Sequence, residues 1–306
     1  MSVKRASRSR FAVAVLGALV GGACAASLAA APFELPPIVQ PASSEHHAGK
    51  VVWVDLVTPN LAAAERFYAG LFGWNFRDIH SGSSHYAVAS LEGRPVAGLF
   101  ERAAPVGEHR QSAWLTFIAV GDVDAAKQSI VAQGGRVLSE PHAYAGRGRQ
   151  AVFTDPQGAV FAILASSNGD PPDVLAEPGE WIWSSLIAKD PGADAAFYQT
   201  LFGYEVFDSS DEGGSEHLML SSDDYLRASV NALPDDGSHH HPHWLNFVRV
   251  VDTTQMTAKV TQLGGRVLVE PRVDRHGGRV AVVADPSGAP FGLLEWPDTQ
   301  SKEVTP

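Results

Sequence analysis

Most of the residues that could do chemistry in this chain come in matched pairs. Arg149 and Arg279 each follow a glycine and could anchor an anionic ligand, although an arginine at a strand end is also often solvated. His85 and His217 occupy similar strand entries, and an imidazole can exchange a proton near neutral pH. The repeated spacing therefore indicates two related sites with a few polar groups each.

Asp55 is a candidate acid. It lies two residues after Trp53, so the alternation of a strand puts both side chains on one face, and the matching residue further along is Ser185. An aspartate in a cavity could transfer a proton together with His85, whereas an aspartate at a cavity rim is simply held by a hydrogen-bond donor. The sequence leaves both alternatives open.

The stretch His239-His240-His241-Pro242-His243 places four imidazoles within five residues, a density that could bind a transition metal. It lies in a loop rich in Pro, Asp and Gly before Trp244, and Gln111-Ser112-Ala113 occupy the matching place before Trp114. Because only one copy of the sequence contains it, we expect a solvent-exposed loop with adventitious metal affinity rather than an active site.

Several other classes of function lack support. Cys24 is the only cysteine, so no disulfide can form within the chain, and there is no Gly-x-Ser-x-Gly motif and no phosphate-binding glycine-rich loop. The formal net charge is -11. Nucleic-acid binding requires neutralisation of phosphates by Lys and Arg, so we expect no nucleic-acid partner.

The N-terminus has the three parts of a secretory signal peptide. Four Lys and Arg residues within the first ten precede an apolar run from Phe11 to Val20, which is too short to span a membrane, and small residues follow. Cys24 stands where a bacterial lipobox would place its acylated cysteine, although an ordinary signal-peptidase site is also compatible. We expect export to the periplasm or cell envelope, with membrane attachment only through a lipid on Cys24.

The sequence contains a tandem duplication. The stretch from Trp53 to Trp74 recurs with substitutions from Trp183 to Tyr204, and the motifs Phe-Tyr, Gly-Gly-Arg-Val and Asp-Pro-x-Gly all recur 130 residues later. A chain of 306 residues that is 45% hydrophobic can hold two cores of ordinary domain size. The expected organisation is a signal segment at 1–24, a linker at 25–49, a first module at 50–166, a linker at 167–179, a second module at 180–298 and a tail at 299–306.

Each module is predicted to contain two βαβββ units, which makes the fold α+β. Val51 to Val57 is rich in β-branched residues and is typical of a strand. Asn60 can cap a helix that ends at Gly73. A second round of strand, helix and strands begins at Trp114, and its last two strands are joined by Asp155-Pro156-Gln157-Gly158, which fits a type I turn.

These motifs resemble the vicinal oxygen chelate superfamily, which includes glyoxalase I, bleomycin-resistance proteins and extradiol dioxygenases. The resemblance is carried by Trp-x-Asp-Leu-x-Thr-Pro, Phe-Tyr-x-x-Leu-Phe-Gly-Trp, Gly-Gly-Arg-Val and Asp-Pro-x-Gly-Ala-x-Phe, and it covers Val51 to Trp296. It implies that paired βαβββ units form a partly open, barrel-like sheet around a small-molecule cavity. A fold of this kind does not by itself determine the chemistry.

The resemblance also implies where a metal ion would bind, and the residues there are unusual. Metal-dependent members take ligands from the first strand of each unit and from its last strand. An indole has an N–H donor and no lone pair for a cation, and Ala and Gly have no side-chain ligand, so we expect neither a metal nor another cofactor. The positions are Trp53, Trp114 and Ala162 in the first module, and Trp183, Trp244 and Gly292 in the second.

The same positions indicate how a ligand could bind. Trp53, Trp114, Trp183 and Trp244 could line cavities and stack a flat or apolar ligand, or they could fill the cores as ordinary packing. The predicted function is therefore binding of a small organic molecule by a monomer with an internal pseudo-dimer. Asp55, Arg149 and Arg279 are the candidate polar contacts.

Two alternatives remain at this point. One is an enzyme of the lyase or dioxygenase type that acts on a small oxygenated substrate by metal-assisted or acid-base chemistry, with Asp55 and His85 as its groups. The other is a structural or interaction domain in which both modules are packed solid. The sequence does not identify the ligand or substrate.

Overall fold

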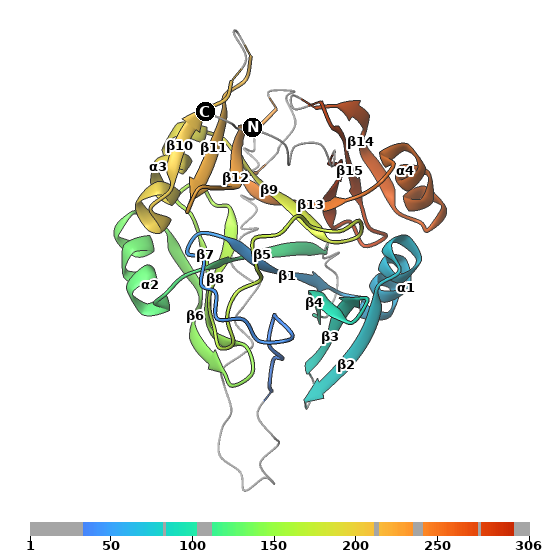
Figure 1. Cartoon of the computed structure of the whole chain (residues 1–306), viewed down its shortest axis with the longest axis horizontal. Coiled ribbons are helices and arrows are strands. Elements are labelled where there is room, and N and C mark those ends of the chain that lie inside the picture. The colour runs from blue at the N-terminus through green and yellow to red at the C-terminus, as the bar shows by residue number, and fades with distance from the viewer. Residues whose placement is uncertain are drawn as a thin grey trace, which may run out of the picture.

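The two copies of the sequence form two separate eight-stranded sheets in the computed structural model, one sheet per module (Figure 1). The structure describes residues 33–81, 84–102, 112–210, 214–234, 241–274 and 277–296. Among these residues no helix is long and apolar enough to cross a membrane. The signal segment and Cys24 lie outside the described residues.

The elements of the first module are β1 (Val51–Thr58), α1 (Leu61–Phe72), β2 (Asn75–Ser81), β3 (Ser84–Leu91), β4 (Arg94–Glu101), β5 (Ala113–Ala119), α2 (Val123–Ala132), β6 (Arg136–Tyr144), β7 (Gly148–Thr154) and β8 (Val160–Ser166). Those of the second are β9 (Trp181–Ala188), α3 (Pro191–Phe202), β10 (Glu205–Asp208), β11 (His217–Ser222), β12 (Tyr225–Ala232), β13 (His243–Arg249), α4 (Thr253–Gln262), β14 (Arg266–Val273), β15 (Arg279–Ala284) and β16 (Pro290–Glu295). Both modules thus contain the two predicted βαβββ units.

Each sheet is open. The strand order is β2-β3-β4-β1-β5-β8-β7-β6 in the first module and β10-β11-β12-β9-β13-β16-β15-β14 in the second, with the first strands of the two units antiparallel at the centre. One face of each sheet carries the helices and is called the helix face here, and the opposite face is called the inner face. The α+β prediction is confirmed, with sheets that do not close into barrels.

The helices begin and end where side-chain chemistry predicts. The Asn60 side chain accepts a hydrogen bond from the backbone N–H of Ala63 at the start of α1. Gly73 ends the helix in the left-handed region, with φ of 77°. The equivalent helix α3 starts at the cap Asp190 and ends at Gly203, which has φ of 72°. The sequence repeat therefore produces the same local structure twice.

The two modules pack through their helix faces, and the packing is reciprocal. Helix α1 lies against α4 of the other module, and α2 lies against α3. Two hydrophobic cores result, and each contains residues of both modules. At the centre, the Asn246 amide donates to the hydroxyl of its equivalent, Thr116, over 2.9 Å. The interface therefore has approximate two-fold symmetry within one chain.

The most faithfully repeated motifs lie in this interface. Tyr68 donates to Asp285 of the second module over 3.3 Å, and Trp114 donates to the Tyr68 hydroxyl over 3.2 Å. The reciprocal set is Tyr198, which donates to Asp155 over 3.2 Å, with Trp244 donating to Tyr198 over 3.0 Å. The Phe-Tyr and Asp-Pro-x-Gly motifs thus connect each helix to a turn of the other module.

Candidate functional site

The inner face of the first module contains a closed polar network. Asp55 Oδ1 accepts hydrogen bonds from Trp53 Nε1 at 2.7 Å and from the Tyr86 hydroxyl at 2.8 Å. Arg147 Nη2 donates to the same hydroxyl over 2.9 Å, and its Nη1 lies 3.8 Å from Asp55 Oδ2. The guanidinium lies 4.8 Å from the Trp53 ring centroid, a cation–π distance. Every member therefore has a protein partner.

The chain itself covers this network. The segment 33–39, which precedes β1, packs Leu35 and Ile38 against Trp53 and Tyr86 (Figure 1). The carbonyl oxygen of Pro36 accepts a hydrogen bond from Arg147 Nε over 3.0 Å. As a result Arg147 is 0% exposed and Trp53 is 4% exposed. Burial raises the pKa of Tyr86, so its hydroxyl stays protonated as a donor.

On the inner face of the second module the polar groups around Trp183 are neutral, and the indole is less buried. Trp183 stands where the first module has Trp53, and it is only half-buried. Its Nε1 donates to the Ser229 hydroxyl over 3.2 Å. Asn231 Nδ2 donates to the same oxygen over 3.1 Å, and the Ser185 hydroxyl lies 2.8 Å away. His217 contacts the Asn231 amide oxygen through Nδ1.

The hydrogen-bonding capacity of the side chains around Ser229 determines which donor remains for a ligand. A hydroxyl oxygen has two lone pairs and one hydrogen. Ser229 accepts from Trp183 and from Asn231, so its own hydrogen must go to Ser185. The hydrogen of Ser185 then remains to be donated, and no acceptor for it occurs among the described residues. The Ser185 hydroxyl is therefore left as a donor beside the Trp183 indole, on a residue that is 5% exposed.

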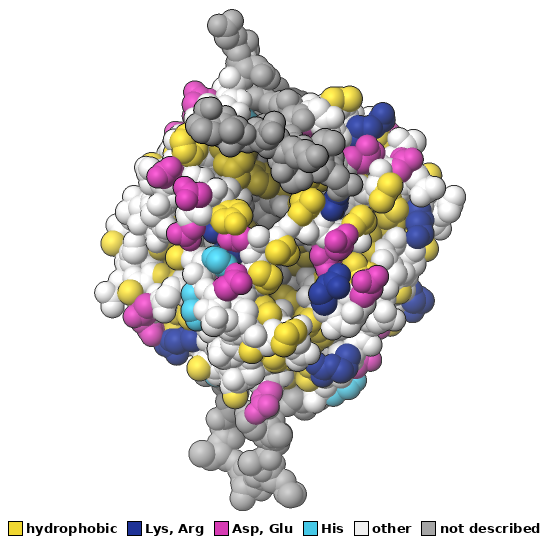
Figure 2. All heavy atoms as spheres, in the orientation of Figure 1, with side chains coloured by type: hydrophobic (Ala, Val, Ile, Leu, Met, Phe, Trp, Pro, Cys, Tyr) yellow, Lys and Arg dark blue, Asp and Glu magenta, His cyan; other side chains and the backbone are white. Residues whose placement is uncertain are grey.

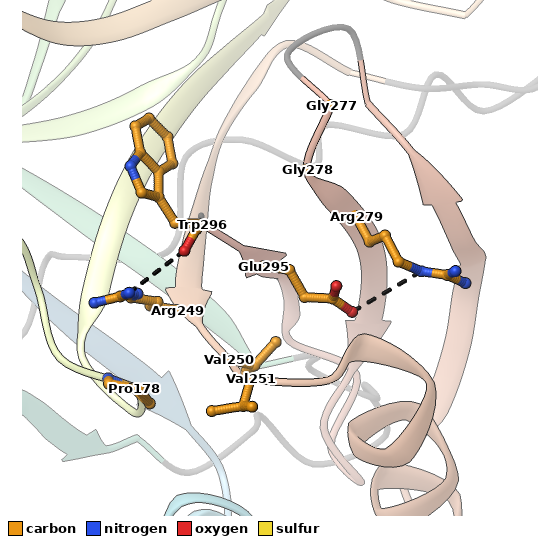
Figure 3. A pocket seen from close by; sticks show the side chains of 9 residues that line it. All are labelled: Pro178, Arg249, Val250, Val251, Gly277, Gly278, Arg279, Glu295 and Trp296. Carbon is orange, nitrogen blue, oxygen red and sulfur yellow. Dashed lines mark hydrogen bonds and ion pairs between the residues drawn. The ribbon is translucent and has the colours of Figure 1, made fainter. Parts of the chain in front are cut away.

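A pocket of about 310 Å³ lies at the end of the same module (Figure 3). Trp296 stacks on Trp183 with ring centroids 6.2 Å apart, and so connects the pocket with the inner face. Arg249 donates to the Trp296 carbonyl oxygen over 3.3 Å at its edge, and Glu295 and Arg279 lie 3.9 Å apart on another side. In Figure 2 hydrophobic side chains gather around a hollow over β9, β12 and β13.

The structure separates the four tryptophans into two pairs. Trp53 and Trp183 lie on inner faces, as expected. Trp114 and Trp244 instead lie on helix faces, where they belong to the two interface cores. Trp114 is paired with Leu56 in the sheet, and strand alternation puts both on the side of the helices. Of the two alternatives left open, core packing therefore holds for Trp114 and Trp244.

The arginine pair also lies away from the inner faces. Arg149 is partly exposed and forms two hydrogen bonds of 2.9 Å with Asp124, in the first turn of α2. This ion pair raises the pKa of Arg149 and lowers that of Asp124. Arg279 lines the pocket near Trp296 on the helix side of the sheet. Whether either residue binds an anion stays a prediction.

His85 and His217 do not occupy equivalent positions in the two sheets, because they differ by one residue in the register. Sheet pairing places His217 at the position of Tyr86, on the inner face, whereas His85 points to the helix face. Asp55 and His85 are thus on opposite faces of the first sheet, so the proton-transfer pair suggested from the sequence does not form. In the histidine-rich loop His241 and His243 are described, with His243 Nδ1 2.8 Å from the His241 carbonyl oxygen, and His239 and His240 lie outside the described residues.

Comparison with known proteins establishes the family. Residues 50–163 match the Glyoxalase/Bleomycin resistance protein/Dioxygenase superfamily, and residues 184–294 match the Glyoxalase-like domain. The chain belongs to the Glyoxalase/Bleomycin resistance protein/Dioxygenase superfamily, as a member with two tandem modules.

Two relatives match along most of their length. The Mycobacterium tuberculosis protein named "Putative glyoxylase CFP32" is 32% identical over 257 residues, which cover 83% of this chain and 98% of the relative. The "Anthracycline biosynthesis protein DauV" of Streptomyces sp. (strain C5) is 31% identical over 259 residues, which cover 81% of this chain and 93% of the relative.

Solved structures show the same fold at low sequence identity. The Mn(II)-bound glyoxalase from Novosphingobium aromaticivorans superimposes with a TM-score of 0.58 at 17% identity, over 81% of this chain and 82% of its own. The 2,3-dioxygenase LapB from Pseudomonas sp. KL28 gives a TM-score of 0.57 at 13% identity, over 84% and 97%. These similarities concern the fold alone.

The residues at the family's metal positions do not fit a metal ion. Sheet pairing shows that Phe117 and Phe247, rather than Trp114 and Trp244, face the first strands on the inner side. A side chain at Gly292 would meet the Phe247 ring at 1.9 Å, so that ring fills the position of the last-strand ligand. None of these side chains offers a lone pair to a cation. The matched positions are Trp53, Phe117 and Ala162 in one module, and Trp183, Phe247 and Gly292 in the other.

Several members of both networks could not be found from the sequence. Arg147 lies in the turn before β7, with no spacing that relates it to Asp55. Tyr86, Ser229 and Asn231 occupy ordinary strand positions. One signal could have been detected. Tyr86 and His217 occupy equivalent sheet positions 131 residues apart, so a tyrosine in the first module is replaced by a histidine in the second.

Proposed function

We propose that this chain binds a small, flat organic molecule on the inner face of the second module, without a metal ion at the family's positions. The observation that carries the proposal is the half-buried Trp183 next to Trp296, with the Ser185 hydroxyl oriented to donate a hydrogen bond. Stacking on an indole favours aromatic ligands, and one hydroxyl donor favours a ligand with a carbonyl or phenolic oxygen.

The first module is the less suitable of the two for this role. Its Trp53 indole is covered by the segment 33–39, and its acid is bound by Trp53, Tyr86 and Arg147. A ligand would have to displace the segment and break the buried network. The second module makes no comparable demand, because the polar groups around Trp183 are neutral hydroxyls, an amide and an imidazole. Arg249, on the same face, is held by the carbonyl oxygens of Ala176 and Trp296.

The name of one relative agrees with a ligand that is aromatic and oxygenated. It is named for anthracycline biosynthesis, and anthracyclines contain fused rings that carry carbonyl and phenolic oxygens. The other name suggests an enzyme. An acid-base mechanism through Asp55 and His85 receives no support from the geometry, because the two side chains lie on opposite faces of the sheet.

The experiment is a fluorescence titration of the full chain with a soluble anthraquinone, which has three fused rings and two carbonyl oxygens. We expect saturable quenching, and we expect Trp183→Ala to weaken binding at least tenfold, or about 1.4 kcal/mol. Ser185→Ala should weaken it about fivefold. Unsaturable quenching, or an unchanged affinity in Trp183→Ala, would contradict the proposal.

Matched controls separate stacking from a general loss of structure. Trp53→Phe changes the equivalent indole in the covered first module, and Ser184→Ala changes the neighbour of Ser185 on the other face of β9. Both variants should bind the anthraquinone as the unmodified chain does. Thermal unfolding of each variant would show that the sheet is intact.

We further propose that the protein acts outside the cytoplasm as a monomer. The support is the signal-like pattern in residues 1–24 and the two-fold interface already present within one chain. Cell fractionation would find the full chain in the envelope, and Cys24→Ser would release it into the soluble fraction if Cys24 carries the lipid. Recovery from the cytoplasm, or a dimer in sedimentation, would contradict these points.

A further inference from the structure

A separate polar cluster lies at the outer edge of the first module. Asp78, His80 and His85 each offer one ligand atom, and these atoms all lie within 4.8 Å of one another. The cluster is on the helix face of the β2–β3 hairpin, opposite the face that holds the family's metal positions. It is thus independent of the inner-face sites.

The hairpin register explains why these residues meet. His80 on β2 is the direct cross-strand partner of His85 on β3, and their rings stack with centroids 4.1 Å apart. Asp78 precedes His80 by two residues, so strand alternation puts it on the same face. Its carboxylate lies 3.4 Å from His85 Nε2. Two imidazoles and a carboxylate are therefore held by one two-stranded element.

Two further carboxylates approach the same histidine from other elements. Glu101, at the end of β4, lies 3.1 Å from His85 Nδ1. Glu65 comes from α1, and its Oε1 is buried without a hydrogen-bond partner among the described residues. Asp78 and His85 are among the charged groups that face Glu65. Three acids around two imidazoles form an arrangement that a cation would stabilise.

We propose that this cluster binds one divalent transition-metal ion, with His80, His85 and Asp78 as ligands and Zn²⁺ as the best-fitting ion. Imidazole nitrogen with carboxylate oxygen suits zinc, whereas Ca²⁺ and Mg²⁺ prefer oxygen ligands alone. Three protein ligands leave a fourth position, which water or the Glu101 carboxylate can fill. The side chains of Asp78 and His85 are partly exposed, so they can rotate to close the present spacing to bonding distance.

The second module lacks this combination, which limits the stoichiometry to one ion at this kind of site. The place of Glu65 is taken by Ala195, and β10 ends at Asp208, whose carboxylate accepts from the backbone of Ser210. His217 points to the inner face instead. The site is thus a feature of one module rather than of the fold.

A bound ion would connect an edge strand to the rest of the sheet. Strand β2 pairs only with β3, and an edge strand is held by fewer contacts than a central one. Ligands from β2 and β3, with an acid from β4, would hold the hairpin closed. Ion binding to the folded state alone also stabilises that state. The expected role is therefore structural, at an outer edge that remains accessible to solvent.

The test is zinc titration by calorimetry of the untagged full chain in which His239, His240, His241 and His243 are all changed to Ala, which removes the histidine-rich loop as a competing site. We expect one equivalent of Zn²⁺ per chain. His80→Ala and Asp78→Asn, both at exposed positions, should each weaken binding at least tenfold. His142→Ala is the matched control, because it removes an exposed histidine from β6, the other edge of the same sheet.

Hydrogen exchange with and without Zn²⁺ provides a second readout. Slower exchange in residues 75–91, lost in His80→Ala, is the expected result. The proposal is overturned if the loop variant binds no zinc saturably, or if His80→Ala and Asp78→Asn bind as tightly as His142→Ala. Because anthraquinone binding involves none of these residues, either proposal can fail without the other.

Discussion

The two inner faces share one backbone register and differ in what covers them. In the first module Asp55 and Arg147 form a buried charged pair under the chain's own segment 33–39. In the second, Ser185 and Ser229 replace the acid and its neighbouring glycine, and Trp183 remains half-buried. The difference shows that a few side chains decide whether such a face is buried as a core or stays partly exposed.

The helix faces of the two modules, in contrast, have the same hydrogen-bond pattern. Tyr68 and Trp114 in one module have the same hydrogen-bond pattern as Tyr198 and Trp244 in the other. Each Tyr hydroxyl reaches a buried aspartate whose pKa is raised by burial. The interface is thus a matched pair of contacts, whereas the inner faces are an unmatched pair.

The largest expected effect is on the charged pair of the first module. Asp55→Ala leaves the Arg147 charge buried without its acid, and should lower the free energy of unfolding by about 3–5 kcal/mol in urea titrations. The equivalent change Ser185→Ala should cost about 1 kcal/mol. Asp124→Ala, which removes the exposed partner of Arg149, should cost less than about 1 kcal/mol. Equal losses for Asp55→Ala and Ser185→Ala would remove the distinction between the faces.

The next largest effect on the free energy of unfolding should come from the segment 33–39, which covers Trp53. Ile38→Ala removes a side chain that is packed against Trp53, and should cost about 3 kcal/mol of unfolding free energy. The same variant should make the Trp53 indole more accessible to acrylamide. Leu175→Ala, at an exposed position of the linker 167–179, is the control and should change neither quantity. Unaltered quenching in Ile38→Ala would mean that the segment is not what covers this face.

One difference between the modules also predicts a pH dependence. Asp194 in α3 stands where α1 has the buried Ala64, and burial together with the Asp155 carboxylate raises the pKa of Asp194 to about 7. A raised carboxyl pKa means that the folded state binds the proton more tightly, so this stability is present at about pH 4 and is lost as the pH rises through 7. Asp194→Asn should therefore raise stability at pH 8 by about 1–2 kcal/mol, after allowance for solvent screening.

Thermal unfolding at pH 5 and pH 8 checks this expectation. Asp194→Asn should narrow the difference in Tm between the two conditions, since the amide does not titrate. Asp224→Asn, on an exposed turn, is the control and should leave the difference unchanged. A difference that persists unaltered in Asp194→Asn would assign the pH dependence to other groups.

The smallest expected effects test the matched interface. Trp114→Phe and Trp244→Phe each remove one hydrogen bond to a Tyr hydroxyl and keep an aromatic ring, so each should cost about 1 kcal/mol in urea unfolding. The two losses should be similar because each indole donates to the equivalent Tyr hydroxyl, and somewhat larger for Trp114, whose ring also packs edge-on against Trp181 with centroids 4.9 Å apart. A threefold difference would show that the symmetry is geometric only.

The duplicated α+β fold could be predicted because it depends on local signals repeated at a fixed offset. The Asn60 cap, the Gly73 stop and the Asp155 turn each act within a few residues. The bounds of strand β2 (Asn75–Ser81) could not be placed from the sequence, because it is a mostly exposed edge strand without a clear alternation of buried residues.

The candidate site could be predicted only in part, because it depends on contacts between distant residues. The face of Trp114 follows from its pairing with Leu56, and a bulge between Val51 and Trp53 shifts the register of that pair of strands. The contact between Asp55 and Arg147 brings a strand and a distant turn together, and no periodic pattern relates them. Strand alternation sufficed to put Asp55 on the same face as Trp53, whereas Trp53 and Trp183 were assigned to the cavity side from the family resemblance.

The reciprocal contacts of Tyr68 with Asp285 and of Tyr198 with Asp155 have a consequence for how such a protein can change. In a homodimer every substitution appears in both subunits at once, so both binding surfaces must remain identical. Here one polypeptide encodes both halves of the interface, and a substitution on one inner face leaves the other unaltered. Because the symmetric interface is shared, one module can take a purely structural role while the other acquires a specialised one.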